Sequence, residues 1–177
     1  MAGEVGLNRV PVESVGLPGE APLAVGVHAP LFSLPDADME TFELAHVMGR
    51  HIVVLCFYPR DGTPVCTRQA IDFSDHDVDF EEETAIVLGV SPDDVLTHAA
   101  FRDEHGLSIR LLSDMDGEVC RKYGVLQPRE NGSGFVIRRA TFVIDRSGVV
   151  RHAIHDVAQR GHAAEVLQLV RQIARNA

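Results

Sequence analysis

The chain has 177 residues, 45% hydrophobic and 24% charged, which is ordinary for a soluble globular protein and enough for one domain with a sizeable core. Its formal net charge of −10 argues against nucleic acid or an anionic membrane as a partner. No apolar stretch reaches the length of a membrane span and the start of the chain lacks a signal-peptide core, so we expect a cytoplasmic protein.

The first half of the chain predicts an extension followed by alternating strands and helices. Residues 1–26 are rich in Gly, Pro, Val and Glu without periodicity, which predicts an extended or poorly ordered segment before a domain of residues 27–177. Two short strands around a turn at residues 36–39 predict an N-terminal β-hairpin. The apolar run over residues 51–57 indicates a central strand covered on both faces. A helix over 66–81 and a second buried strand over 84–90 should follow.

The second half continues this alternation. Ser91 followed by Pro92 predicts a helix start, with serine as the N-cap, and Gly106 should end that helix. The remaining expected elements are a strand at 110–112, a short helix at 116–123, a hairpin of 140–145 with 149–155, and a last helix whose apolar stripe runs from Ala163 to Ala174. The order predicts an α/β sheet with strands of mixed direction.

Cys66 stands where a predicted strand gives way to a predicted helix, in the run YPRDGTPVCT of residues 58–67. The unpaired N–H groups and the positive dipole end of a helix start favour a thiolate, which is the nucleophilic form of cysteine. Most free cysteines are small buried hydrophobes. Here two prolines, a glycine and an aspartate precede the thiol and predict a surface loop. We therefore favour an exposed, reactive cysteine.

The spacing Pro-x-x-x-Thr-x-x-Cys, from Pro59 to Cys66, resembles the active-site motif of the peroxiredoxins, a family of thiol peroxidases. The resemblance extends from about residue 27 to the last helix and looks closest to the Q-type, or bacterioferritin-comigratory, branch. Residues 112–117 (LSDMDG), 123–125 (YGV) and 139–145 (RATFVID) also carry it. The resemblance implies a thioredoxin-like fold, with a mixed central sheet flanked by helices and an N-terminal β-hairpin.

The same resemblance implies roles for four residues. Cys66 would attack the O–O bond and become a sulfenic acid, Thr63 would bind the peroxide through its hydroxyl, and Pro59 would shield the sulfur. Arg139, just before the strand of residues 140–145, would supply the positive charge. Two simpler interpretations stay open, because Arg139 could be a solvated charge at a strand edge, like Arg138, and Pro59 could simply end a strand.

A second thiol is harder to assign. Many Q-type relatives place a resolving cysteine five residues after the first, and that position is Ile71 here. Cys56 lies in the predicted central strand and is most simply a core residue. Cys120 is a candidate resolving cysteine, either exposed beside its basic neighbours or buried. Gln69 stands where relatives commonly carry glutamate and could orient its neighbours through hydrogen bonds.

Two function classes remain. The first is an antioxidant thiol peroxidase that reduces hydrogen peroxide and organic hydroperoxides and is recycled by thioredoxin, by a small thiol or by Cys120. The second is a non-enzymatic redox sensor or chaperone that is oxidised once at Cys66. Thr63 and Arg139 favour the enzyme. We expect no cofactor and no metal, and either a monomer or a weak homodimer. The three cysteines contain no Cys-x-x-Cys pair, which argues against a dithiol oxidoreductase of the thioredoxin type.

Overall fold

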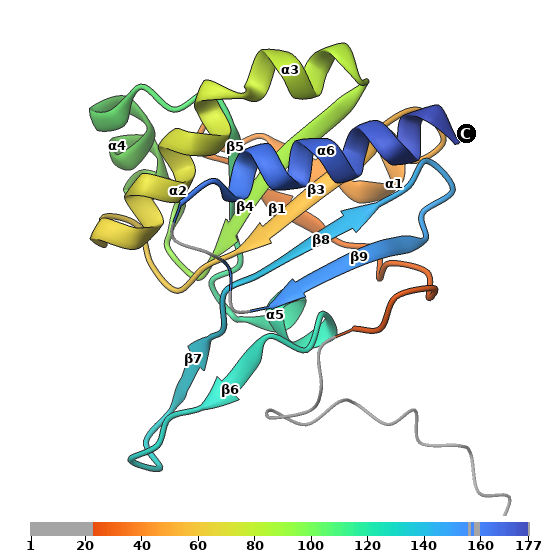
Figure 1. Ribbon diagram of the computed structural model, residues 1–177. Coiled ribbons are helices and arrows are strands. Elements are labelled where there is room, and N and C mark those ends of the chain that lie inside the picture. The colour runs from red at the N-terminus through yellow and green to blue at the C-terminus, as the bar shows by residue number, and fades with distance from the viewer. Residues whose placement is uncertain (1–22, 156, 158–159, 177) are drawn as a thin grey trace, which may run out of the picture.

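The computed structural model describes residues 23–155, 157 and 160–176, and its centre is a five-stranded sheet in the order β5-β4-β3-β8-β9 (Figure 1). β3 pairs in parallel with β4, and β4 in parallel with β5, whereas β8 is antiparallel to both β3 and β9. This arrangement confirms the predicted α/β sheet of mixed direction. The strands are β3 (Ile52–Phe57), β4 (Ala85–Ser91), β5 (Arg110–Ser113), β8 (Ala140–Ile144) and β9 (Val150–His155).

Each face of the sheet has its own cover, as Figure 1 shows. The longer helices pack on one face, and an N-terminal hairpin with two short helices packs on the other, which confirms the predicted hairpin. The helices of the first face are α2 (Pro64–Asp75), α3 (Asp77–Glu82), α4 (Val95–His105) and α6 (His162–Arg175). The second face carries β1 (Ser33–Pro35), β2 (Thr41–Glu43), α1 (Leu44–Val47) and α5 (Glu118–Lys122).

The alternation of side chains along β3 divides the core into two clusters. Val53, Leu55 and Phe57 pack among the aromatic residues on the α5 face, while Ile52 and Val54 pack under α2, α3 and α6. Burying both faces of one strand removes an apolar run of this kind from water. The prediction of a central strand covered on both sides is confirmed. As a consequence, the end of β3 fixes where the chain enters the loop before α2.

Several predicted boundaries differ from the structure. The expected helix over 66–81 is broken at His76 into α2 and α3. Ser91 is the last residue of β4, and Asp94 caps α4 instead by accepting a hydrogen bond from the Thr97 N–H at 2.7 Å. The structure also has an antiparallel hairpin that was not among the expected elements, formed by β6 (Leu126–Pro128) and β7 (Phe135–Ile137).

The predicted N-terminal extension lies almost wholly outside the described residues, since residues 1–22 are not among them. At its described end, the Leu23 N–H donates to the Tyr123 carbonyl at 3.2 Å and the Gly26 N–H donates to the Val150 carbonyl at 2.8 Å. The division at residue 27 stays a prediction. Within the described part of the chain, no helix combines the length and apolar character needed to cross a membrane.

Candidate active site

Cys66 lies in the first turn of α2, at the end of the loop that leaves β3. The helix starts here because Thr63 has an extended backbone suited to an N-cap and Pro64 occupies the first helical position. The Thr63 Oγ1 accepts a hydrogen bond from the Cys66 N–H at 3.3 Å. The side chain expected to be exposed is buried, since Cys66 is only 3% exposed. The loop composition is therefore a poor guide to the thiol, because the first helical turn folds back onto the sheet.

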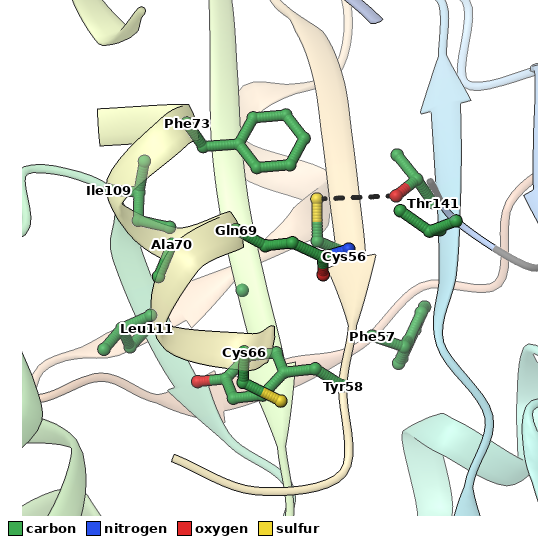
Figure 2. A pocket seen from close by; sticks show the side chains of 12 residues that line it. Cys56, Phe57, Tyr58, Cys66, Gln69, Ala70, Phe73, Ile109, Leu111 and Thr141 are labelled. Atoms are coloured by element: carbon green, nitrogen blue, oxygen red, sulfur yellow. Dashed lines mark hydrogen bonds between the residues drawn. The ribbon is translucent and has the colours of Figure 1, made fainter. Parts of the chain in front are cut away.

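A small cavity of about 20 Å³ lies beside Cys66, between α2 and the strands β3, β4 and β5 (Figure 2). A volume of this size holds about one water-sized molecule. Most of its lining is apolar, so the few polar atoms that reach it stand out. The lining residues are Cys56, Phe57, Tyr58, Cys66, Gln69, Ala70, Phe73, Gly89, Ile109, Leu111, Thr141 and Val157.

Gln69 brings a polar side chain to the lining of this cavity, and Arg139 contacts Gln69. Arg139 directly precedes β8, and its Nη1 donates to the Gln69 Oε1 at 3.4 Å. A guanidinium can only donate, so the contact turns the amide oxygen of Gln69 toward Arg139 and its nitrogen away. That Nε2 atom is buried and has no hydrogen-bond partner among the described residues. Gln69 thus links the cavity that Cys66 lines to the positive charge of Arg139, and it also carries an unsatisfied donor.

Pro59 and Thr63 face a second, open hollow rather than the inner cavity. It measures about 480 Å³ and lies between the active-site loop, the turn before α5 and the β6–β7 hairpin. Exposed apolar side chains stand along its edge, with Met115 at 69%, Phe135 at 50% and Val136 at 38% exposure. Thr63 therefore connects the two hollows, because it lines the groove and also contacts the main chain of Cys66.

The other two thiols differ in their relation to Cys66. Cys120 is fully buried in the core on the α5 face, and its N–H donates to the Asp114 Oδ2 at 2.8 Å. Burial, followed by the nearby Asp114 carboxylate, raises the pKa of the Cys120 thiol. Cys56 points to the α2 face and lines the same cavity as Cys66, and its sulfur accepts a hydrogen bond from the Thr141 hydroxyl at 3.8 Å. Figure 2 marks this contact with a dashed line. Burial raises the pKa of Cys56 to about 12. All three thiols are free.

Sequence reasoning missed a polar cluster beneath the active-site loop. Asp61 lies two residues before Thr63, and its carboxylate contacts the imidazole of His98 on α4 and the hydroxyl of Tyr58. The local signal for His98 is slight. It stands three residues before the buried Phe101 and so shares the inner face of α4.

Comparison with known proteins gives independent evidence of the family. The AhpC/TSA family model matches residues 25–153. A putative peroxiredoxin bcp of Coxiella burnetii is 39% identical over 147 residues, which cover 82% of this chain and 97% of that protein.

Solved structures agree with this match. Peroxidoxin BcpB of Mycobacterium tuberculosis superimposes with a TM-score of 0.78 at 33% identity, over 84% of this chain and 97% of that one. The bacterioferritin comigratory protein of Xanthomonas campestris, studied as a trapped intermediate/ligand complex for its alkyl peroxide reduction activity, gives a TM-score of 0.77 at 32% identity, over 81% of this chain and 92% of that one. These neighbours confirm the expected thioredoxin-like fold.

Proposed function

The chain is a thiol peroxidase of the AhpC/TSA family, in its Bcp or peroxiredoxin Q branch, and we propose that Cys66 is the residue that peroxide oxidises. One observation carries the assignment. Thr63 caps the helix whose first turn carries Cys66, and Arg139 contacts Gln69, which lines the same cavity as Cys66. A nucleophile, a hydroxyl and a cation are thus gathered at one helix start.

In the proposed reaction the Cys66 thiolate attacks one oxygen of a peroxide, ROOH. The S–O bond forms as the O–O bond breaks, and the departing RO⁻ takes up a proton to leave as ROH, so that Cys66 becomes a sulfenic acid. The Thr63 hydroxyl accepts from the Cys66 N–H, which leaves its own proton free to donate to a peroxide oxygen. Arg139 and the Gln69 Nε2, which has no partner among the described residues, are the groups we assign to stabilise the developing oxyanion.

The proposed substrates are hydrogen peroxide and organic hydroperoxides. The cavity beside Cys66 has room for a molecule of about the size of water, which suits the peroxide group itself. The groove beside Pro59 and Thr63 has apolar side chains along its edge, and these suit the organic part of a larger hydroperoxide. Pro59 keeps its proposed role of limiting solvent around the sulfur, since it packs in the loop between groove and helix.

The proposed reductant is an external thiol, either thioredoxin or a small thiol, acting in the cytoplasm. A first thiol would condense with the sulfenic acid to a mixed disulfide and water, and a second thiol would then release Cys66. Ile71 leaves no thiol one helical turn away, and Cys120 is buried on the opposite face of the sheet. Three free cysteines are also what a reducing compartment maintains.

The first test replaces Cys66 by serine, which should abolish peroxide consumption and leave the circular dichroism spectrum unchanged. Cys56→Ser is the matched control, because it removes a thiol from the same cavity without removing the proposed nucleophile. Dimedone labelling after one equivalent of peroxide should mark Cys66 in the control variant. Turnover in a folded Cys66→Ser protein would refute the assignment.

The second test identifies the recycling partner by non-reducing peptide mapping of the oxidised protein. Trypsin separates the three cysteines into peptides 51–60, 61–68 and 111–121, so that any internal disulfide appears as a linked pair. We expect a sulfenic acid or a mixed disulfide on peptide 61–68. A dominant link to 111–121, reducible by thioredoxin, would make Cys120 the resolving residue. A link to 51–60 would give that role to Cys56.

A further inference from the structure

A buried polar network lies directly beneath the active-site loop, and neither the fold nor the proposed chemistry accounts for it. Its centre is the Asp61 carboxylate, whose side chain is 3% exposed. The Asp61 Oδ1 accepts a hydrogen bond from the Tyr58 hydroxyl at 2.6 Å, and its Oδ2 lies 2.5 Å from the His98 Nδ1. Burial, followed by the Asp61 carboxylate, raises the pKa of Tyr58, so this hydroxyl keeps its proton and donates.

The surroundings of His98 determine where its protons lie. Its ring is fully buried, and its Nε2 lies 3.0 Å from the Leu112 carbonyl oxygen, which can only accept. The Nε2 therefore carries a proton. The short contact between Nδ1 and the Asp61 carboxylate requires a second proton between those two atoms. His98 and Asp61 thus form a proton-sharing pair that ties the loop to α4 and β5.

A bound cation would explain the pair less well than a proton does. Asp61, Asp93 and His98 place ligand atoms within 4.8 Å of one another, a spacing that can hold a metal ion. Two ligands on one ion, each with a bond of about 2.1 Å at a right angle, lie about 3 Å apart. The 2.5 Å separation between the Asp61 and His98 atoms is too short for that arrangement.

The main chain of Asp61 is fixed as firmly as its side chain. Its N–H donates to the Asp93 Oδ2 at 2.7 Å, and the same oxygen accepts from the Ser91 hydroxyl at 2.7 Å. Only Gly62 separates Asp61 from Thr63, and it has a φ of +81°, a conformation that glycine adopts without strain. The position of the Thr63 N-cap therefore depends on the anchor at Asp61.

We propose that Asp61 and His98 are positioning residues for the peroxidase reaction, holding the loop so that the Thr63 hydroxyl and Cys66 meet the peroxide in the reactive geometry. The proposal rests on the function assigned to Cys66 and Thr63 above. Neither Asp61 nor His98 touches the reacting atoms, and their effect passes through the loop. A displacement of about 1 Å of a positioning group can cost about a hundredfold in rate.

The test uses two substitutions of His98 that each keep one of its hydrogen bonds. The amide of His98→Asn reaches the place of Nδ1 and can still donate to Asp61, whereas that of His98→Gln reaches the place of Nε2 and can donate only to the Leu112 carbonyl. We expect the rate constant of Cys66 oxidation by hydrogen peroxide to fall by about ten- to a hundredfold in His98→Gln and several times less in His98→Asn.

Three controls separate positioning from stability. Phe101→Leu changes a buried apolar residue on the same helix, and its peroxide rate should match that of wild type. Alkylation of Cys66 by iodoacetamide needs the thiol but no bound peroxide, so its rate should not fall by more than about threefold in the His98 variants. Tyr58→Phe removes one hydrogen bond to Asp61 and replaces His98→Gln as the test variant if His98→Gln does not fold. Its rate of oxidation by peroxide should fall by a smaller factor.

Equal losses in His98→Asn and His98→Gln, or peroxide and iodoacetamide rates that fall together, would overturn the proposal. So would a wild-type peroxide rate in folded His98→Gln or in Tyr58→Phe. The same assay includes Cys66→Ser. If that variant still consumes peroxide, the function assigned to Cys66 has failed instead, and the two failures are thereby distinguished.

Discussion

Replacing Arg139 by alanine removes the cation that we assign to the leaving oxygen of the peroxide. Among the described residues, this guanidinium donates to a neutral partner, the Gln69 Oε1 at 3.4 Å. That distance exceeds the usual length of about 2.7–2.9 Å for a charge-assisted hydrogen bond. Gln69 therefore orients Arg139 without neutralising it, and the positive charge remains available when the O–O bond breaks.

The size of the effect follows from the chemistry of an oxyanion site. One preorganised donor aimed at developing negative charge contributes about 3 kcal/mol to transition-state stabilisation, which corresponds to about a hundredfold in rate. Arg139→Lys keeps the charge but loses the planar fork that contacts Gln69, so its rate should fall by about tenfold.

The assay is the rate constant of Cys66 oxidation by hydrogen peroxide, measured by stopped flow before any recycling step. Arg138→Ala is the matched control, since it removes the adjacent arginine and one positive charge from the same segment. A rate for Arg139→Ala within about twofold of wild type would show that another group supplies the charge. A fall of equal size in Arg138→Ala would show that overall charge, and not the contact with Gln69, is what matters.

Two further predictions concern the helix that carries Cys66 and the residues packed around it. Thr63→Val removes the N-cap, so its unfolding free energy should fall by about 1 kcal/mol and its rate of oxidation by peroxide by at least about tenfold. Thr63→Ser keeps the hydroxyl and should keep both the stability and the rate. Thermal melts measure the first quantity and stopped flow the second. Burial lowers the pKa of His162, although Glu165 and Asp72 act in the opposite sense. The imidazole of His162 therefore binds a proton more readily in the unfolded chain than in the folded one. The unfolding free energy in urea should therefore fall as the pH drops below 6.5, and His162→Gln should reduce that fall; an unchanged pH profile in the variant would contradict the prediction.

The strands were predictable because their apolar runs are local and continuous, whereas the helix boundaries depend on contacts that the pattern does not contain. Phe73 and Phe80 are both buried at helical spacing, so the apolar periodicity passes through the break at His76. Likewise, Ser91-Pro92 has the composition of a helix start. Because Ser91 pairs with Ser113, β4 extends through Ser91, and the N-cap of α4 is Asp94 instead.

The candidate site divides in the same way. Thr63 and Cys66 lie three residues apart, and their contact follows from the rules for a helix start. Arg139 lies 70 residues from Gln69, and only the family resemblance pointed to it. Neither the rules for a helix start nor the family resemblance pointed to His98. It is 37 residues from Asp61 and contacts it only because α4 packs beneath the loop. Chain topology, which no local pattern encodes, brings these pairs together.

The burial of Cys66 has a consequence for the two halves of the proposed cycle. At 3% exposure the sulfur can meet an oxidant of the size of a peroxide, but a protein thiol must approach it more openly. Reduction by thioredoxin would then require the first turn of α2 to loosen, which breaks the contact between Thr63 and Cys66. The contacts that hold the loop for oxidation are those that oppose its opening for reduction. Loosening the Asp61 anchor should therefore slow oxidation while making the sulfenic acid easier for a protein reductant to reach, so the two rates should move in opposite directions.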